Sequence, residues 1–77
     1  MKDEIVSALS AAFPGAEIDL ELAGNRVELV IVSAAFAGLS RVRRQQAVYA
    51  CIQQYIADGS LHAVTMRALT PDESRSG

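Results

Sequence analysis

Only a few side chains in this sequence have chemistry beyond packing and solvation: one histidine, one cysteine and a short group of arginines. His62 stands between a glycine-containing turn and an apolar stretch that ends at Leu69. A neutral imidazole binds iron and titrates near neutral pH, so His62 is the candidate metal ligand. The alternative is a structural histidine at the end of a strand that only forms a hydrogen bond with the backbone.

Cys51 lies among apolar residues at helical spacing, beside Ile52 and four positions before Tyr55. A buried thiol packs as a small hydrophobic group and is a poor nucleophile. With one histidine, the sequence offers no convincing Ser-His-Asp triad or Cys-His pair. We therefore expect no catalytic residue and no enzymatic activity. A single cysteine also excludes an internal disulfide.

Three arginines open the longest helical segment, where cations oppose the helix dipole at modest cost. Together with the preceding turn they predict a surface that binds a partner's carboxylates or nucleic-acid phosphates. This predicted docking surface consists of Phe36, Gly38, Ser40, Arg41, Arg43 and Arg44. A solvated helix face is the alternative for the arginines, and a core position is the favoured alternative for Phe36. One glycine in this turn does not match the GXXG clamp of a KH domain.

The helices and strands that must position these residues follow from hydrophobic periodicity. The expected elements are a helix over Lys2–Phe13, strands over Ala16–Leu22 and Arg26–Ser33, a helix over Arg41–Ala57 and a strand over His62–Leu69. Gly24-Asn25 predicts a tight hairpin turn. The second strand is apolar on both faces, which is typical of the middle of a sheet. Glu17, Asp19 and Glu21 alternate with apolar residues and predict a solvated face.

This order predicts an α+β domain of two layers, with a three-stranded mixed sheet and helices on one face. The element order is αββαβ, or αββααβ if the long helix breaks near Ala47, and it matches class II KH-like domains. Residues 1–71 form the single domain, and residues 72–77 are expected to be a disordered polar tail. The net charge of -2 argues against a surface that attracts nucleic acid everywhere. No apolar run approaches the roughly 20 residues of a membrane span, so the expected location is the cytoplasm.

Several motifs occur here in an order that resembles the BolA family. They are VIVS at 30–33, FAGLS at 36–40, RQQAVY at 44–49, IADGSLHAV at 56–64 and LTP at 69–71. Within the family, the sequence is most similar to the short subgroup known as IbaG or YrbA. The resemblance implies a KH-like fold and partnership with a monothiol glutaredoxin, with which BolA-like proteins share a bridging [2Fe–2S] cluster in the presence of glutathione. It also implies that His62 is a cluster ligand.

The sequence departs from the family pattern at one place. Many members carry a second histidine or cysteine between the first two strands, but this loop reads Ala23-Gly-Asn-Arg26 and has no usual iron ligand. Either His62 is the only ligand from this chain, or cluster binding is weak or absent.

Two functions are hypotheses at this point. The first is an adaptor that binds a glutaredoxin in iron–sulfur handling or a stress response, being itself a monomer or a weak homodimer. The second is a transcriptional regulator that binds DNA through the Gly38 turn and the Arg41–Arg44 helix start, since the family is also described in that role.

Overall fold

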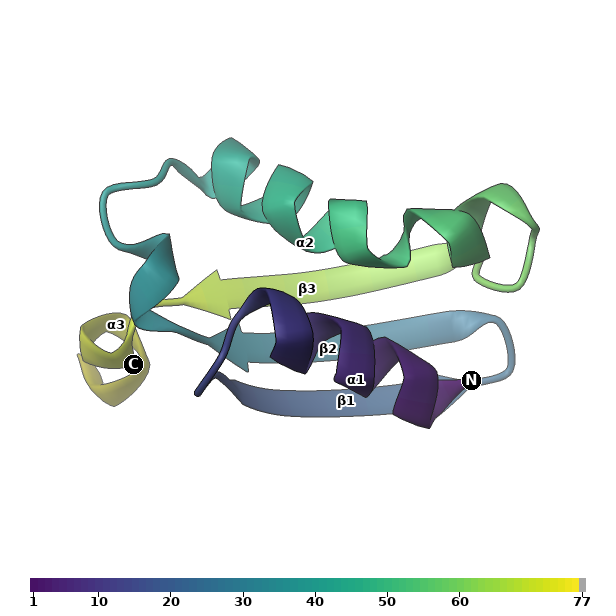
Figure 1. The fold of residues 1–77 in the computed structure, drawn as a ribbon, viewed down its shortest axis with the longest axis horizontal. Coiled ribbons are helices and arrows are strands. Elements are labelled where there is room, and N and C mark those ends of the chain that lie inside the picture. Colours follow the sequence, from purple (N-terminus) through teal and green to yellow (C-terminus); the bar gives the residue numbers. More distant parts are fainter. Residues whose placement is uncertain (77) are drawn as a thin grey trace.

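The fold combines helices with a three-stranded sheet, as the sequence predicted, in a computed structural model that describes residues 1–76 (Figure 1). The elements are α1 (Lys2–Ala12), β1 (Glu17–Ala23), β2 (Arg26–Val32), the 3-10 helix η1 (Ala34–Phe36), α2 (Arg41–Ala57), β3 (Ala63–Leu69) and α3 (Pro71–Ser76). Helix α2 has the predicted bounds and does not break near Ala47. Its first turn is capped by Ser40, whose hydroxyl accepts a hydrogen bond from the Arg43 N–H at 3.2 Å.

The sheet has the order β1-β2-β3, with β2 in the middle. Strand β1 pairs with β2 in antiparallel fashion through the tight turn at Gly24, whose φ of 61° suits glycine. Strand β3 pairs with β2 in parallel, after the crossover through α2. The two-sided apolar pattern of β2 therefore identified the central strand correctly.

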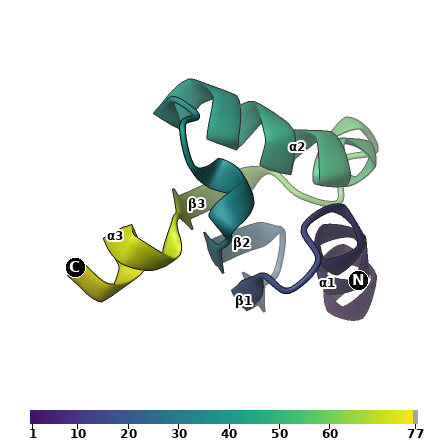
Figure 2. The ribbon, with the colours of Figure 1, turned by 60° about the vertical axis from the view of Figure 1, so that its left-hand side comes forward.

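Alternate residues of each strand point to opposite faces of the sheet, and the strand register shows which of these faces the helices cover. Ile31 of β2 lies between Ile18 of β1 and Ala68 of β3, on the side packed by helices. The next row, Asp19, Val30 and Arg67, lies on the other face. Helices α1 and α2 cover one face, while α3 extends away from them beyond the end of β3 (Figure 2).

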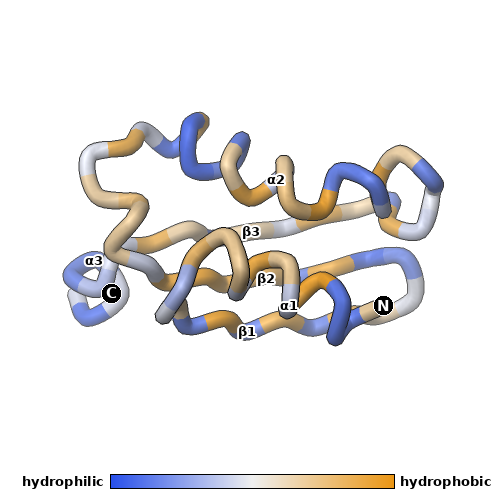
Figure 3. Tube along the Cα trace, viewed as in Figure 1, coloured by the Kyte–Doolittle hydropathy of each residue, from blue (hydrophilic) through white to orange (hydrophobic). Residues whose placement is uncertain are grey.

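The core lies between the covered face of the sheet and helices α1 and α2. The apolar stretch of β2 runs through the middle of the sheet (Figure 3). The buried side chains of the core are Ile5, Leu9, Phe13, Leu20, Val27, Leu29, Ile31, Phe36, Val48, Ile52 and Leu61. Burying one large apolar side chain stabilises the fold by about 1.5–3 kcal/mol. Among residues 1–76, no helix has the length and apolar content needed to cross a membrane.

The structure corrects the expectation of a disordered polar tail. Residues 72–76 continue in helix α3, and Gly77 lies outside the described residues. A reciprocal capping box starts this helix: the Thr70 N–H donates to Glu73 Oε1 at 2.9 Å, and the Glu73 N–H donates to Thr70 Oγ1 at 3.2 Å. Polar composition suggested disorder, but this local hydrogen-bond pair and a contact with α2 order the segment.

Candidate functional site

His62 lies in the bend that joins α2 to β3, and β3 begins one residue later than predicted, at Ala63. The His62 N–H donates to the carbonyl oxygen of Asn25 at 2.8 Å, in the β1–β2 turn. The neighbouring Leu61 is buried, and its N–H donates to the carbonyl oxygen of Tyr55 at 3.0 Å. The backbone around His62 is therefore fixed by α2 and by the β1–β2 turn, while the side chain itself is exposed.

This arrangement offers a single metal donor. Within residues 1–76, no group of three or more His, Cys, Asp or Glu side chains is placed to hold a metal ion. Asn25, whose carbonyl oxygen accepts the His62 N–H, lies in a turn that has no histidine or cysteine. A [2Fe–2S] cluster needs four ligands, so this chain cannot hold one alone, and a cluster bound at His62 would need its other three ligands from outside the chain.

Cys51 packs against the edge of the core, as its place in the apolar stripe predicted. It is half-buried, and its Sγ donates to the carbonyl oxygen of Ala47 at 3.6 Å. Burial raises the pKa of the Cys51 thiol, which lowers the fraction of reactive thiolate at neutral pH. These observations make Cys51 a packing residue.

Arg44 joins three elements of the fold at the other end of α2. Its Nε donates to the carbonyl oxygen of Leu39 at 3.0 Å, and one terminal nitrogen donates to the carbonyl oxygen of Ala68 at 3.1 Å. The guanidinium also forms a two-point ion pair with Glu73, at 2.6 and 3.3 Å. Only 14% of the Arg44 side chain is exposed. The N–H donors of the Arg44 guanidinium therefore form hydrogen bonds within the protein, and these bonds link α2 to β3 and α3.

Glu73 is a residue of this region that sequence reasoning missed. Hydrogen bonding from the Arg44 guanidinium, with a further contribution from the Thr70 N–H, lowers the pKa of Glu73 to about 2. The carboxylate therefore stays ionised at any ordinary pH. The signal was present in the sequence as Thr70-Pro-Asp-Glu73, which fits the capping-box pattern that predicts a helix start.

The remaining members of the predicted docking surface differ in their placement. Phe36 is fully buried, with its ring centroid 5.1 Å from that of Phe13, so it supports the turn from inside and lies off the surface. The favoured alternative for Phe36, a core position, is confirmed, and its inclusion in the predicted docking surface is wrong, because a large ring gains more by closing the core. Gly38, Arg41 and Arg43 are exposed, and Gly38 has a φ of 80°.

The structure separates the two groups of candidate residues. Helix α2 carries the arginines at its start and leads into the His62 bend after its end, where the β1–β2 turn also lies (Figure 1). With 17 residues, α2 is about 25 Å long. His62 and the arginines therefore form two separate sites at opposite ends of the molecule.

Comparisons with known proteins agree with the geometry. The family model described as "BolA-like protein" matches residues 10–73. An uncharacterized protein encoded in the rpoN-murA intergenic region of Acinetobacter guillouiae is 45% identical over 95% of this chain and 88% of that protein. The acid stress protein IbaG of Escherichia coli K12 is 39% identical over 92% of this chain and 84% of that protein.

Solved structures show the same fold. BolA1 from Arabidopsis thaliana superposes with a TM-score of 0.84 over 92% of both chains, at 24% identity. Because the family model covers most of the sequence and the fold agrees, the chain belongs to the BolA family.

Proposed function

We propose that this protein is an adaptor that binds a monothiol glutaredoxin and contributes His62 to a [2Fe–2S] cluster shared between the two proteins. The observation that carries the proposal is the exposed imidazole on a backbone fixed at two points. A fixed backbone lowers the conformational entropy that is lost when the ligand binds iron. An exposed side chain is required when the other ligands come from a partner.

The partner would contact the end of the molecule that holds the His62 bend and the β1–β2 turn. The arginines at the start of α2 lie about 25 Å away along the helix, too far to touch the cluster. By binding, the protein would replace one thiol ligand with an imidazole, which raises the reduction potential of the cluster. The acid stress protein IbaG is a relative, and it supports a role of this adaptor in a stress response.

Titration of a cluster-loaded monothiol glutaredoxin with this protein tests the proposal, with visible circular dichroism and size-exclusion chromatography as readouts. We expect a new cluster spectrum and a heterodimer with the wild type, and loss of the new spectrum with His62→Ala. His62→Cys should restore a cluster-bearing complex with a different spectrum and a lower reduction potential, because a thiolate replaces the imidazole.

A matched control comes from the opposite end of the molecule. Arg43→Ala removes an exposed charge far from His62 and should leave the spectrum unchanged. If the wild type gives neither a heterodimer nor a spectral change, the adaptor function is wrong. If His62→Ala forms a complex with the wild-type spectrum, the protein binds the glutaredoxin but His62 is no ligand.

The second function, DNA binding through the start of α2, has weaker support. Arg44 is occupied by Glu73 and Phe36 is buried, so the exposed basic residues of this surface are Arg41 and Arg43. Two exposed arginines on a chain with a net charge of -2 give little attraction for a polyanion.

A further inference from the structure

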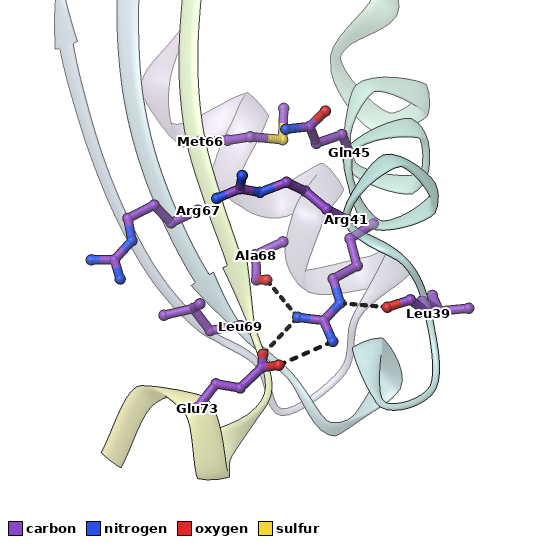
Figure 4. A pocket seen from close by; sticks show the side chains of 9 residues that line it. Leu39, Arg41, Gln45, Met66, Arg67, Ala68, Leu69 and Glu73 are labelled. Atoms are coloured by element: carbon purple, nitrogen blue, oxygen red, sulfur yellow. Dashed lines mark hydrogen bonds and ion pairs between the residues drawn. The ribbon is translucent and has the colours of Figure 1, made fainter. Parts of the chain in front are cut away.

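A groove of about 370 Å³ lies between the start of α2 and the outer edge of β3 (Figure 4). Small-molecule sites commonly have volumes of about 300–1,000 Å³, so the groove can hold a small ligand. The residues that matter for its chemistry are Leu39, Arg41, Arg44, Met66 and Glu73. Arg67 also lines the groove, but its side chain points to the opposite face of the sheet (Figure 4). Because the groove is remote from His62, a ligand could bind in it whether or not the proposed adaptor function is correct.

The groove has more positive than negative groups. The charged side chains that face it are Arg41, Arg44 and Glu73, two cations and one carboxylate. Arg44 is paired with Glu73, whereas Arg41 forms no ion pair within residues 1–76. Arg41 and Arg44 are three residues apart on α2, so they lie on the same side of the helix. Figure 4 shows the Arg41 side chain extending from α2 toward β3, and both line the groove.

The chain itself shows which chemistry the groove accepts. Glu73 is bound through both carboxylate oxygens by Arg44, in the geometry that guanidinium groups use for carboxylates and phosphates. A free ligand that reaches Arg44 must compete with this tethered carboxylate, whose effective concentration is on the order of millimolar. A second carboxylate is therefore at a disadvantage, whereas a phosphate carries a charge of about -2 and three acceptor oxygens.

We propose that the groove binds the phosphate group of a small phosphorylated molecule. Arg41 holds the phosphate, and Arg44 joins it when Glu73 is displaced. The half-buried side chains of Leu39 and Met66 contact the apolar part of the ligand. Glu73 acts as an internal competitor, so the affinity of the groove depends on the position of α3.

Isothermal titration calorimetry of the full chain at low ionic strength tests this site, with inorganic pyrophosphate as the probe. We expect Arg41→Ala to weaken binding by about tenfold, the effect of losing one charged hydrogen bond. Arg43→Ala is the matched control, because it removes the same charge from the same helical turn but does not line the groove. It should change the affinity by about twofold or less. Glu73→Gln removes the competing charge and should tighten binding by about tenfold.

Two further measurements separate binding from other effects. Circular dichroism and thermal denaturation of each variant show whether the fold is retained, and Arg41→Lys keeps the charge without the forked geometry. ADP as a second probe should bind more tightly than pyrophosphate, because its nucleoside can contact Leu39 and Met66.

Three results would overturn the site. One is the absence of binding of both probes to the wild type and to Glu73→Gln. Another is an equal loss of affinity in Arg41→Ala and Arg43→Ala, which would indicate a nonspecific electrostatic attraction of the probes to the helix start. The third is binding of duplex DNA without binding of either small probe, which would assign the surface to nucleic acid.

Discussion

The chemically distinctive side chains of this protein lie at the start of α2 and just after its end, and their environments are opposite. At the start of α2, the Arg44 side chain is nearly buried and its donors bind Leu39, Ala68 and Glu73. After the end of α2, the His62 backbone is held by Asn25 while the imidazole is exposed. The Arg44 side chain therefore links elements of the fold, whereas only the backbone of His62 is held and its side chain is exposed.

The comparison yields predictions that rank the two ends by their effect on stability. The largest effect is expected at Phe36, which closes the core beneath the arginine turn. Phe36→Ala removes a fully buried ring and should lower the free energy of unfolding by about 3–5 kcal/mol. That is a large part of the stability of a domain of this size. Urea denaturation followed by circular dichroism measures it, and a loss below about 1 kcal/mol would contradict the burial of the ring.

Arg44→Ala should have the next largest effect. The substitution leaves the carbonyl oxygens of Leu39 and Ala68 without this donor and frees Glu73 from α2. The free energy of unfolding should fall by about 2 kcal/mol, as for the loss of partly buried hydrogen bonds to a charged group. Arg43→Ala is the control in the same turn and should stay within about 0.5 kcal/mol of the wild type. Equal effects of both substitutions would mean that Arg44 has no special structural role.

The Arg44–Glu73 ion pair predicts a dependence of stability on pH. Hydrogen bonding from Arg44 lowers the pKa of Glu73 from 4.5 to about 2 in the folded state. Because the folded-state pKa is the lower one, the stabilising contribution is fully present above pH 4.5 and is lost as the pH falls to about 2. The difference in melting temperature between the wild type and Glu73→Gln should thus be constant between pH 5 and 7, as ionisation is complete there, and should vanish near pH 2. A difference that disappears already at pH 4.5 would show that Arg44 does not hold the carboxylate.

The smallest effect on stability is expected at His62. Its side chain is exposed, and its backbone hydrogen bond to Asn25 does not depend on the imidazole. His62→Ala should change the free energy of unfolding by less than about 0.5 kcal/mol, measured by urea denaturation. A loss as large as that of Arg44→Ala would remove the contrast between the two ends and assign His62 a structural role.

Much of the fold was predictable because the signals are local. The Ser40 N-cap and the stop at Asp58-Gly59 gave α2 its bounds, and the apolar pattern on both faces of β2 identified the central strand. Polar composition misled the prediction at residues 72–76, where the capping box from Thr70 to Glu73 was the better indicator. Composition averages over a segment, whereas a capping box depends on two residues at one spacing.

The candidate site was predictable only in part. The lone histidine pointed to His62, but the proposed docking surface grouped residues by their closeness in sequence. The structure buries Phe36, pairs Arg44 with a residue 29 positions away and places both far from His62. No local pattern contains this information, because Arg44 could equally have faced solvent.

The sequence by itself determined the family, the order of helices and strands, and the identity of the single imidazole, since each depends on residue types and on spacings of a few positions. The tertiary structure alone decided which side chains are exposed to solvent and which are held by internal hydrogen bonds or ion pairs. It set His62 beside the β1–β2 turn and brought Glu73 to Arg44, forming the groove along β3. The physical reason is that burial and ion pairing depend on how α2, β3 and α3 pack together.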